Sequence, residues 1–169
     1  MSAMRARWTA VLAVAGLATA ATVAAAGDVR PLQKRGARLL DEGVRRSAAM
    51  RALVDELSRS DMVVYVDLDP NEPATGLEGA LRFRAATPEA RYVRVWLQPR
   101  RCDSALMPVL AHELQHAVEV ARAADVRSAE SFRALYAAVG RSGTVGHYET
   151  AAALEMGARV RRELEDAKK

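Results

Sequence analysis

The order of apolar and polar positions predicts a helix, a group of strands and then further helices. Residues 31–58 repeat apolar side chains near a period of 3.6, which is typical of an amphipathic helix, although two glycines in its first half would allow two pieces. Residues 62–68 form an almost continuous apolar run rich in β-branched side chains, which indicates a buried strand. Apolar and polar side chains alternate over residues 80–85 and 92–97 and predict two more strands, joined as a hairpin.

The second half of the chain predicts three helices. The first runs from about residue 103 to 123, and Asp103 or Ser104 can cap its start. The second is short and carries apolar side chains at helical spacing, namely Phe132, Leu135, Tyr136 and Val139. A loop over residues 140–146 leads to the last helix, from about 147 to 166. With no internal repeat and no interdomain linker, this order predicts a single α+β domain.

The first 26 residues have the pattern of a secretory signal peptide. Arg5 and Arg7 precede an uncharged stretch over residues 8–27, which contains an alanine-rich A-x-A cleavage site ending at Ala26. We expect cleavage after Ala26, which leaves residues 27–169 as the mature domain and places it in the periplasm or outside the cell. The alternative is an uncleaved membrane anchor, since twenty residues could just span a bilayer.

Charge and cysteine content exclude several classes of protein. The full chain has 169 residues and a net charge of +4, and removal of residues 1–26 leaves 143 residues with a net charge of +2. Neither a basic helix nor a run of basic and aromatic residues stands out, so we expect no nucleic-acid partner. The single Cys102 excludes an internal disulfide, a Cys-rich zinc finger and an Fe–S cluster, and we expect it to be a small, at least partly buried thiol.

The predicted helix over residues 103–123 contains the sequence HELQH, an H-E-x-x-H motif formed by His112, Glu113 and His116. Residues four apart lie one turn apart on the same helix face, so the two imidazoles can converge on one metal ion. Zinc accepts such nitrogen ligands. Glu113 follows the first histidine, where its carboxylate can accept a proton from a metal-bound water without being a ligand. The motif therefore predicts a Zn²⁺ site with Glu113 as the general base.

A catalytic zinc site needs a third protein ligand, for which the sequence offers Glu119, His147, Glu149 and Glu155. Glu119 continues the face of the motif, a position that suits support of a ligand better than direct binding. Glu155 has arginines at i+4 and i+7, which suffice as partners. We favour Glu149, because helical spacing places it on an apolar stripe where a buried carboxylate needs a partner. The stripe comprises Ala152, Ala153, Met156 and Val160, and its two alanines would let the last helix pack close to the motif helix.

The motif followed by a downstream helix bearing Glu149 resembles the gluzincin branch of the zincin metallopeptidases, over residues 62–165. The resemblance implies a zincin-like domain, in which a small β-sheet with an edge strand packs on the H-E-x-x-H helix and further helices. It further implies that residues 92–97 are the edge strand that binds the substrate backbone, and that His147 or Tyr148 stabilises the oxyanion. The chain lacks the large helical C-terminal subdomain and the Glu-x-x-x-Asp pairing of well-known gluzincins, since residue 153 is alanine.

These observations predict a secreted or periplasmic zinc metallopeptidase of the metalloendopeptidase type. Its partner would be a peptide or protein substrate, with a membrane involved only if the N-terminal segment is uncleaved. The oligomeric state stays open. The alternative function is a non-catalytic, zinc-binding envelope module that retains the zincin scaffold. The two differ at the fourth metal position, which is open in an enzyme and closed by a side chain in a structural site.

Overall fold

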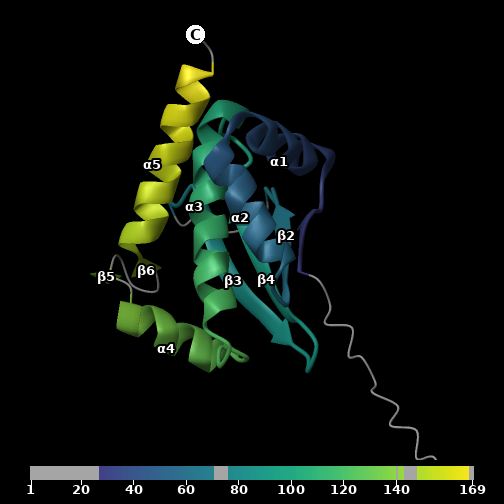
Figure 1. The fold of residues 1–169 in the computed structure, drawn as a ribbon, viewed down its shortest axis with the longest axis vertical. Helices are drawn as coiled ribbons and strands as arrows, with labels where there is room; N and C mark the ends of the chain where they lie inside the picture. Colours follow the sequence, from purple (N-terminus) through teal and green to yellow (C-terminus); the bar gives the residue numbers. More distant parts are fainter. Residues whose placement is uncertain (1–26, 71–75, 140, 143–147, 168–169) are drawn as a thin grey trace, which may run out of the picture.

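The computed structural model describes residues 27–70, 76–139, 141–142 and 148–167. These residues form five helices and a four-stranded mixed sheet, so that the domain is α+β (Figure 1). The elements are β1 (Asp28–Pro31), α1 (Lys34–Arg46), α2 (Ala48–Ser58), β2 (Met62–Asp67), β3 (Gly79–Ala86), β4 (Arg91–Leu97), α3 (Asp103–Arg122), α4 (Ala129–Val139), β5 (Arg141–Ser142), β6 (Tyr148–Glu149) and α5 (Ala151–Asp166).

The predicted signal peptide, residues 1–26, lies outside the described residues. Within the part of the chain that is described, none of the helices combines the length and the apolar character that a membrane crossing requires.

The sheet has the strand order β1-β2-β4-β3, in which β1, β2 and β4 are parallel and β3 is antiparallel to β4. The predicted hairpin is confirmed, but the prediction that residues 92–97 form an edge strand is wrong. That segment is β4, which pairs with β2 on one side and with β3 on the other. β3 and β1 are the two edge strands, and the exposed Arg82 and Arg84 of β3 suit such a position, where charged side chains oppose pairing with another chain.

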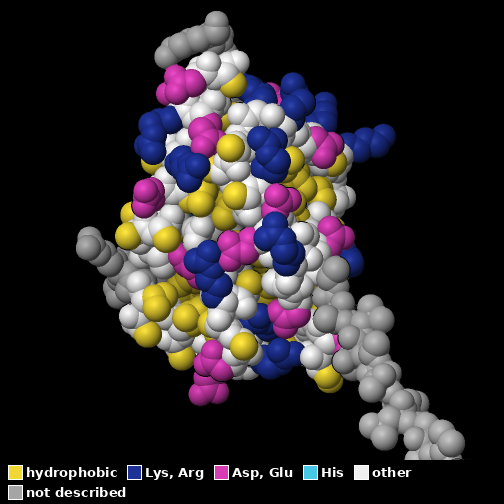
Figure 2. All heavy atoms as spheres, viewed as in Figure 1, with side chains coloured by type: hydrophobic (Ala, Val, Ile, Leu, Met, Phe, Trp, Pro, Cys, Tyr) yellow, Lys and Arg dark blue, Asp and Glu magenta, His cyan; other side chains and the backbone are white. Residues whose placement is uncertain are grey.

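Helix α3 lies at the centre of the domain and contacts β2, β3 and β4 on one side and α1, α2 and α5 on the others. Its apolar side chains pack against the valines of one sheet face to form the core. The fully buried members include Leu106, Leu110, Leu114, Val64, Val66, Val93 and Val95. This burial accounts for the apolar runs that predicted both the central strands and the motif helix. On the face of the molecule shown in Figure 2, positive and negative side chains are interspersed.

The predicted helix over residues 31–58 is two helices that meet at Ser47. Ser47 is the N-cap of α2, and its hydroxyl accepts a hydrogen bond from the Met50 N–H at 3.0 Å. The same hydroxyl donates to Glu163 on α5 at 2.6 Å, and the Ala49 N–H donates to the same carboxylate at 3.1 Å. Burial alone would raise the pKa of Glu163, but these hydrogen bonds and Arg159 lower it. The carboxylate therefore attaches α5 to the start of α2.

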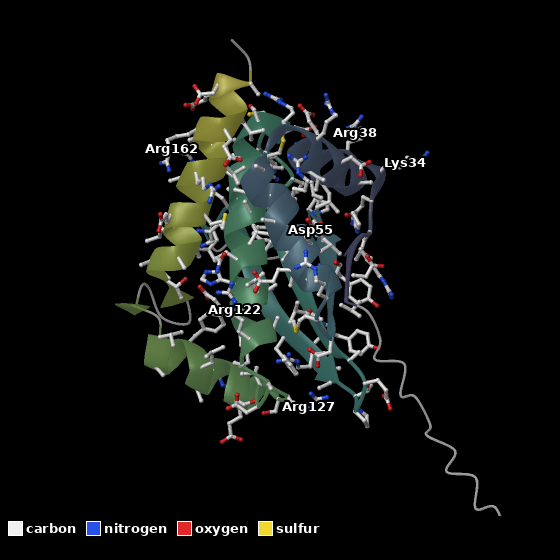
Figure 3. The ribbon with its side chains drawn as sticks, viewed as in Figure 1. Lys34, Arg38, Asp55, Arg122, Arg127 and Arg162 are labelled. Carbon is white, nitrogen blue, oxygen red and sulfur yellow. The ribbon has the colours of Figure 1, made fainter. Side chains whose placement is uncertain are left out.

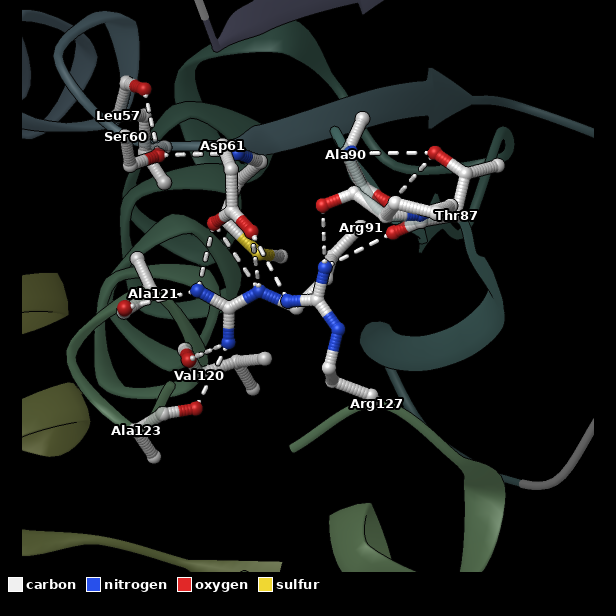
Figure 4. A network of polar contacts seen from close by, with 12 residues as sticks. Leu57, Ser60, Asp61, Thr87, Ala90, Arg91, Val120, Ala121, Ala123 and Arg127 are labelled. Carbon is white, nitrogen blue, oxygen red and sulfur yellow. Dashed lines mark hydrogen bonds and ion pairs between the residues drawn. The ribbon is translucent and has the colours of Figure 1, made fainter. Parts of the chain in front are cut away.

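Arg91 connects β4 to the C-terminal end of α3 (Figure 4). Its side chain is 3% exposed and forms an ion pair with Asp61 at 2.6 Å. The remaining donors bind the helix-end carbonyls of Val120 and Ala123, both at 2.7 Å, and of Ala121 at 2.9 Å. A guanidinium at this position adds donors to carbonyls at the helix end, two of which, Val120 and Ala123, also accept a backbone N–H at 3.1 Å. The network thus holds the motif helix against the sheet.

We expect the substitution Arg91→Met to lower the free energy of unfolding by about 3 kcal/mol, because it removes the buried guanidinium that pairs with Asp61 at 2.6 Å and binds the helix-end carbonyls. Chemical denaturation followed by circular dichroism measures the change. Arg59→Met is the matched control, since Arg59 is exposed and should change stability by less than about 0.5 kcal/mol. Equal stabilities of the two variants would show that the network does not hold α3.

Candidate metal centre

His112 and His116 lie on one face of α3, as their spacing predicts. Their ring centroids are 4.9 Å apart and the rings are nearly perpendicular, at 81°. Glu149 joins them from β6, and potential ligand atoms of the three side chains all lie within 4.8 Å of one another. The structure therefore brings together the three residues that the sequence favours as metal ligands.

Glu149 lies on a different element from the one that the sequence predicts. The last helix begins at Ala151 and not at residue 147, so Glu149 lies in β6 and outside the helical stripe. Thr150 caps the helix, and its hydroxyl accepts a hydrogen bond from the Ala153 N–H at 3.1 Å. The buried face of α5 consists of Ala153, Gly157, Val160 and Leu164.

Close packing of α5 on α3 depends on small residues. Ala153 is fully buried, as expected, whereas Ala152 is exposed and makes no such contact. Gly157 is the second small residue at this interface. A methyl group there would lie 3.2 Å from the carbonyl oxygen of Pro108 and 3.5 Å from the Cβ atom of His112. The α5 backbone therefore passes directly beside the first metal-ligand candidate.

The other candidate ligands are placed differently. Glu155 is exposed, and it is not part of the metal-ligand cluster found among the described residues. Glu119 lies behind His116, as described below. His147 lies outside the described residues; Tyr148 belongs to β6, but its side chain is not described. The catalytic roles of His147 and Tyr148 stay predictions. Cys102 is exposed at the N-cap of α3, so the prediction of a buried thiol is wrong.

Each imidazole is held by a hydrogen bond on the side away from the cluster. Nδ1 of His116 lies 2.9 Å from Oε2 of Glu119, and the Thr150 hydroxyl donates to Oε1 of the same carboxylate at 2.6 Å. The ring of His112 hydrogen-bonds to the backbone of Ala153. Such partners orient metal-binding imidazoles and select their tautomers. The sequence suggests a supporting role for Glu119. It does not predict the contact of Ala153 with His112, because any residue type can supply a backbone group.

Burial and neighbouring charges shift the pKa values of the cluster residues in different directions. Burial and the neighbouring His116 lower the pKa of His112, which favours the neutral form that binds metals. Burial also acts to lower the pKa of His116, but the hydrogen bond to Glu119 and nearby carboxylates raise it overall. Glu113 is 6% exposed, and burial raises its pKa to about 7.

The environment of Oε2 of Glu149 tests whether a metal ion fits between the three side chains. This oxygen is buried and has no hydrogen-bond partner among the described residues, although it lies 3.2 Å from Nε2 of His112. A buried carboxylate oxygen without a donor is costly. A divalent cation between the two imidazoles and this oxygen would satisfy it. Two nitrogens and one carboxylate oxygen are a common ligand set for catalytic zinc.

The edge strand β3 approaches Glu113 closely. A methyl group on Gly79 would lie 2.7 Å from Cγ1 of Val109 and 3.0 Å from Oε1 of Glu113, so only glycine fits without displacement. The backbone of Leu81 hydrogen-bonds to the Glu113 carboxylate and partly offsets the rise in its pKa. β3, and not β4, is therefore the strand beside the candidate catalytic residue.

Two pockets meet at the cluster. The first has a volume of about 170 Å³ and is lined by Leu77, Gly79, Ala80, Leu81, His112, Glu113, His116, Phe132, Arg133, Tyr136 and Glu149. The second, of about 360 Å³, extends between β3, α3 and α5. They share Leu77, Gly79, His112, Glu113 and Glu149. The cluster thus lies where the two pockets join, with one pocket on each side of it.

Comparisons with protein-family models, with the sequences of curated proteins and with solved structures found no match.

We expect Glu119→Ala to weaken Zn²⁺ binding about 10- to 100-fold, because His116 would lose the partner that orients it. Competition with a chromophoric chelator measures the affinity. Glu155→Ala provides a control, since this exposed glutamate lies outside the cluster. Unchanged affinity in the Glu119 variant would mean that the carboxylate does not support the ligand.

Proposed function

We propose that the chain is a zinc-dependent peptidase that acts outside the cytoplasm, as a secreted or periplasmic protein. The observation that carries the proposal is the convergence of His112, His116 and Glu149 within 4.8 Å, with Glu113 buried beside them. The N-terminal pattern supports the location, with an uncleaved membrane anchor as the alternative.

His112, His116 and Glu149 would hold the ion. Three protein ligands leave one position for water or substrate, which is the arrangement of catalytic zinc sites. When bound, Zn²⁺ would supply a Lewis acid that lowers the pKa of a water and polarises the substrate carbonyl. The positive charge would also favour the carboxylate form of Glu113.

Glu113 would move the proton. Its carboxylate accepts a proton from the attacking water, whose oxygen forms a bond to the carbonyl carbon of the peptide. Glu113 then donates that proton to the amide nitrogen as the C–N bond breaks, which leaves a carboxylic acid and an amine. Burial raises the pKa of Glu113 to about 7, and the positive ion would oppose this rise and favour the carboxylate form that accepts the proton.

The shape around the cluster supports cleavage within a polypeptide. The two pockets continue on opposite sides of shared residues that include His112 and Glu113. Among the described strands, β3 pairs with β4 alone, so its other edge offers backbone groups to which an extended peptide can add as a further strand. An endopeptidase needs room for substrate on both sides of the reacting bond, and this arrangement provides it.

The alternative is a zinc-binding envelope module without turnover. A structural zinc has no need of a base, whereas here a buried carboxylate lies beside the three candidate ligands and lines the same pocket. This observation favours the enzyme, and the two experiments below separate the possibilities.

We expect purified protein to bind one Zn²⁺ per chain, measured by elemental analysis after dialysis. His112→Ala, His116→Ala and Glu149→Ala should each lose stoichiometric zinc, because each removes a ligand. Glu155→Ala should retain it. Full zinc content in the His112 variant would refute the site, and full content in the Glu149 variant alone would assign the third ligand elsewhere.

Glu113→Gln should retain zinc and lower peptide hydrolysis by about 10²- to 10⁴-fold, the usual contribution of a general base. Mass spectrometry of a peptide library, incubated with and without a chelator, measures cleavage. Hydrolysis that survives in this variant would remove Glu113 from the mechanism. A zinc-loaded wild-type protein that cleaves no peptide would instead support the envelope module.

A further inference from the structure

Arg133, on α4, lines the pocket formed by α3, α4 and β3 and is the only Lys or Arg among the described residues that line it. No ion pair of Arg133 is present in the described part of the chain. By contrast, Arg127, just before the same helix, donates hydrogen bonds to the carbonyls of Thr87 and Pro88 and forms an ion pair with Asp61 (Figure 4). Arg127 thus has a structural role, whereas Arg133 is exposed and has no such partner among the described residues.

The carboxylates near this pocket already have other contacts. Glu149 faces His112, with 3.2 Å between Oε2 and Nε2. Glu113 accepts a hydrogen bond from the backbone of Leu81, and Glu119 is bonded to His116 and Thr150. The guanidinium of Arg133 therefore has its five donors available for a group that enters the pocket from outside.

The wall beside Arg133 is apolar and well packed. Leu77, Leu81 and Phe132 line it. The ring of Phe132 contacts those of Tyr136, with 4.9 Å between centroids, and Phe83, with 6.1 Å. An apolar wall that carries a guanidinium matches a side chain with a short methylene stem and a terminal carboxylate, which arginine can bind in a bidentate manner.

We propose that this pocket is a substrate subsite for an acidic side chain, glutamate or aspartate, and that Arg133 determines its specificity. The inference rests on the proposed peptidase function, which it makes more specific by naming an acidic polypeptide as the substrate class. Glu113 and Glu149 line both pockets; the first pocket adds Arg133 and no further carboxylate, whereas the second adds Glu78 as well as Arg161 and carries no such selection.

The test measures binding rather than turnover. Fluorescence anisotropy with Glu113→Gln protein would compare labelled, acetylated and amidated peptides that carry Glu, Gln or Lys at successive positions. At one position, Glu should bind about tenfold more tightly than Gln, as expected for a hydrogen bond between charged groups. Adding Arg133→Glu should remove this preference and make Lys the better residue, and Arg133→Lys should retain part of it.

The matched control is Arg162→Glu, which makes the same charge change on an exposed side chain that projects from the outer side of α5 (Figure 3). It should leave the preference for Glu unchanged. A peptide that ends at the selected position, with Gln and a free carboxylate, separates recognition of a side chain from recognition of a chain terminus. Tight binding of that peptide alone would overturn the acidic side-chain subsite.

A Glu-to-Gln affinity ratio that is the same with and without Arg133→Glu would also overturn the proposal, as would peptide binding too weak to detect. The zinc content of the same samples distinguishes failure of the peptidase proposal from failure of the subsite proposal. The Glu-to-Gln affinity ratio is also measured on metal-free protein. Bound zinc without any charge preference contradicts only the subsite. Failure to bind zinc contradicts the peptidase, while the affinity ratio still decides the role of Arg133.

Discussion

The approach of α5 to α3 is the contact on which the candidate site depends. Gly157 and Ala153 let the α5 backbone pass beside Pro108 and His112. This approach brings β6, and with it Glu149, against the imidazoles of α3. The opposite end of α5 is attached by Glu163 to the start of α2. Larger side chains at the interface would separate the helices, and the carboxylate would then move away from the two histidines.

Burial gives this cluster its chemistry. A carboxylate that is 6% exposed, a pair of neighbouring imidazoles and a carboxylate oxygen without a donor are unfavourable in a purely structural core. The surroundings hold each group in one orientation, through Glu119, Thr150 and the backbone of Ala153. Groups arranged in this way favour a metal ion, because the ion compensates the unfavourable burial and uses the arranged donors.

The sequence predicted those parts of the fold whose signal lies in side-chain periodicity. The helices, the hairpin and the spaced pair of His112 and His116 follow directly from it. Glu149 is favoured from the sequence as a buried acid that needs a partner, but its side chain is 44% exposed and lies in β6. β1 was missed because four residues that end in proline give too short a pattern. The edge position that the resemblance implied for residues 92–97 was also wrong, since alternation predicts a strand but does not say on how many sides it pairs.

Backbone contacts account for most of what the sequence did not predict in the site. The support of His112 by Ala153, the contact of Leu81 with Glu113 and the close approach of Gly79 all arise from the main chain. The start of α5 was misplaced because Glu149 fits the apolar stripe of the helix as well as it fits the short strand before the Thr150 cap. Tertiary packing decides between these two local structures.

X-ray absorption spectroscopy of the zinc-loaded protein would test the central claim most directly, because it reports the atoms bound to the ion. We expect two imidazole nitrogens at about 2.0–2.1 Å, carboxylate oxygen at about 2.0–2.2 Å and a further light atom in an open position. A sulfur ligand, which only Cys102 or a methionine could provide, or a first shell without imidazole would contradict it.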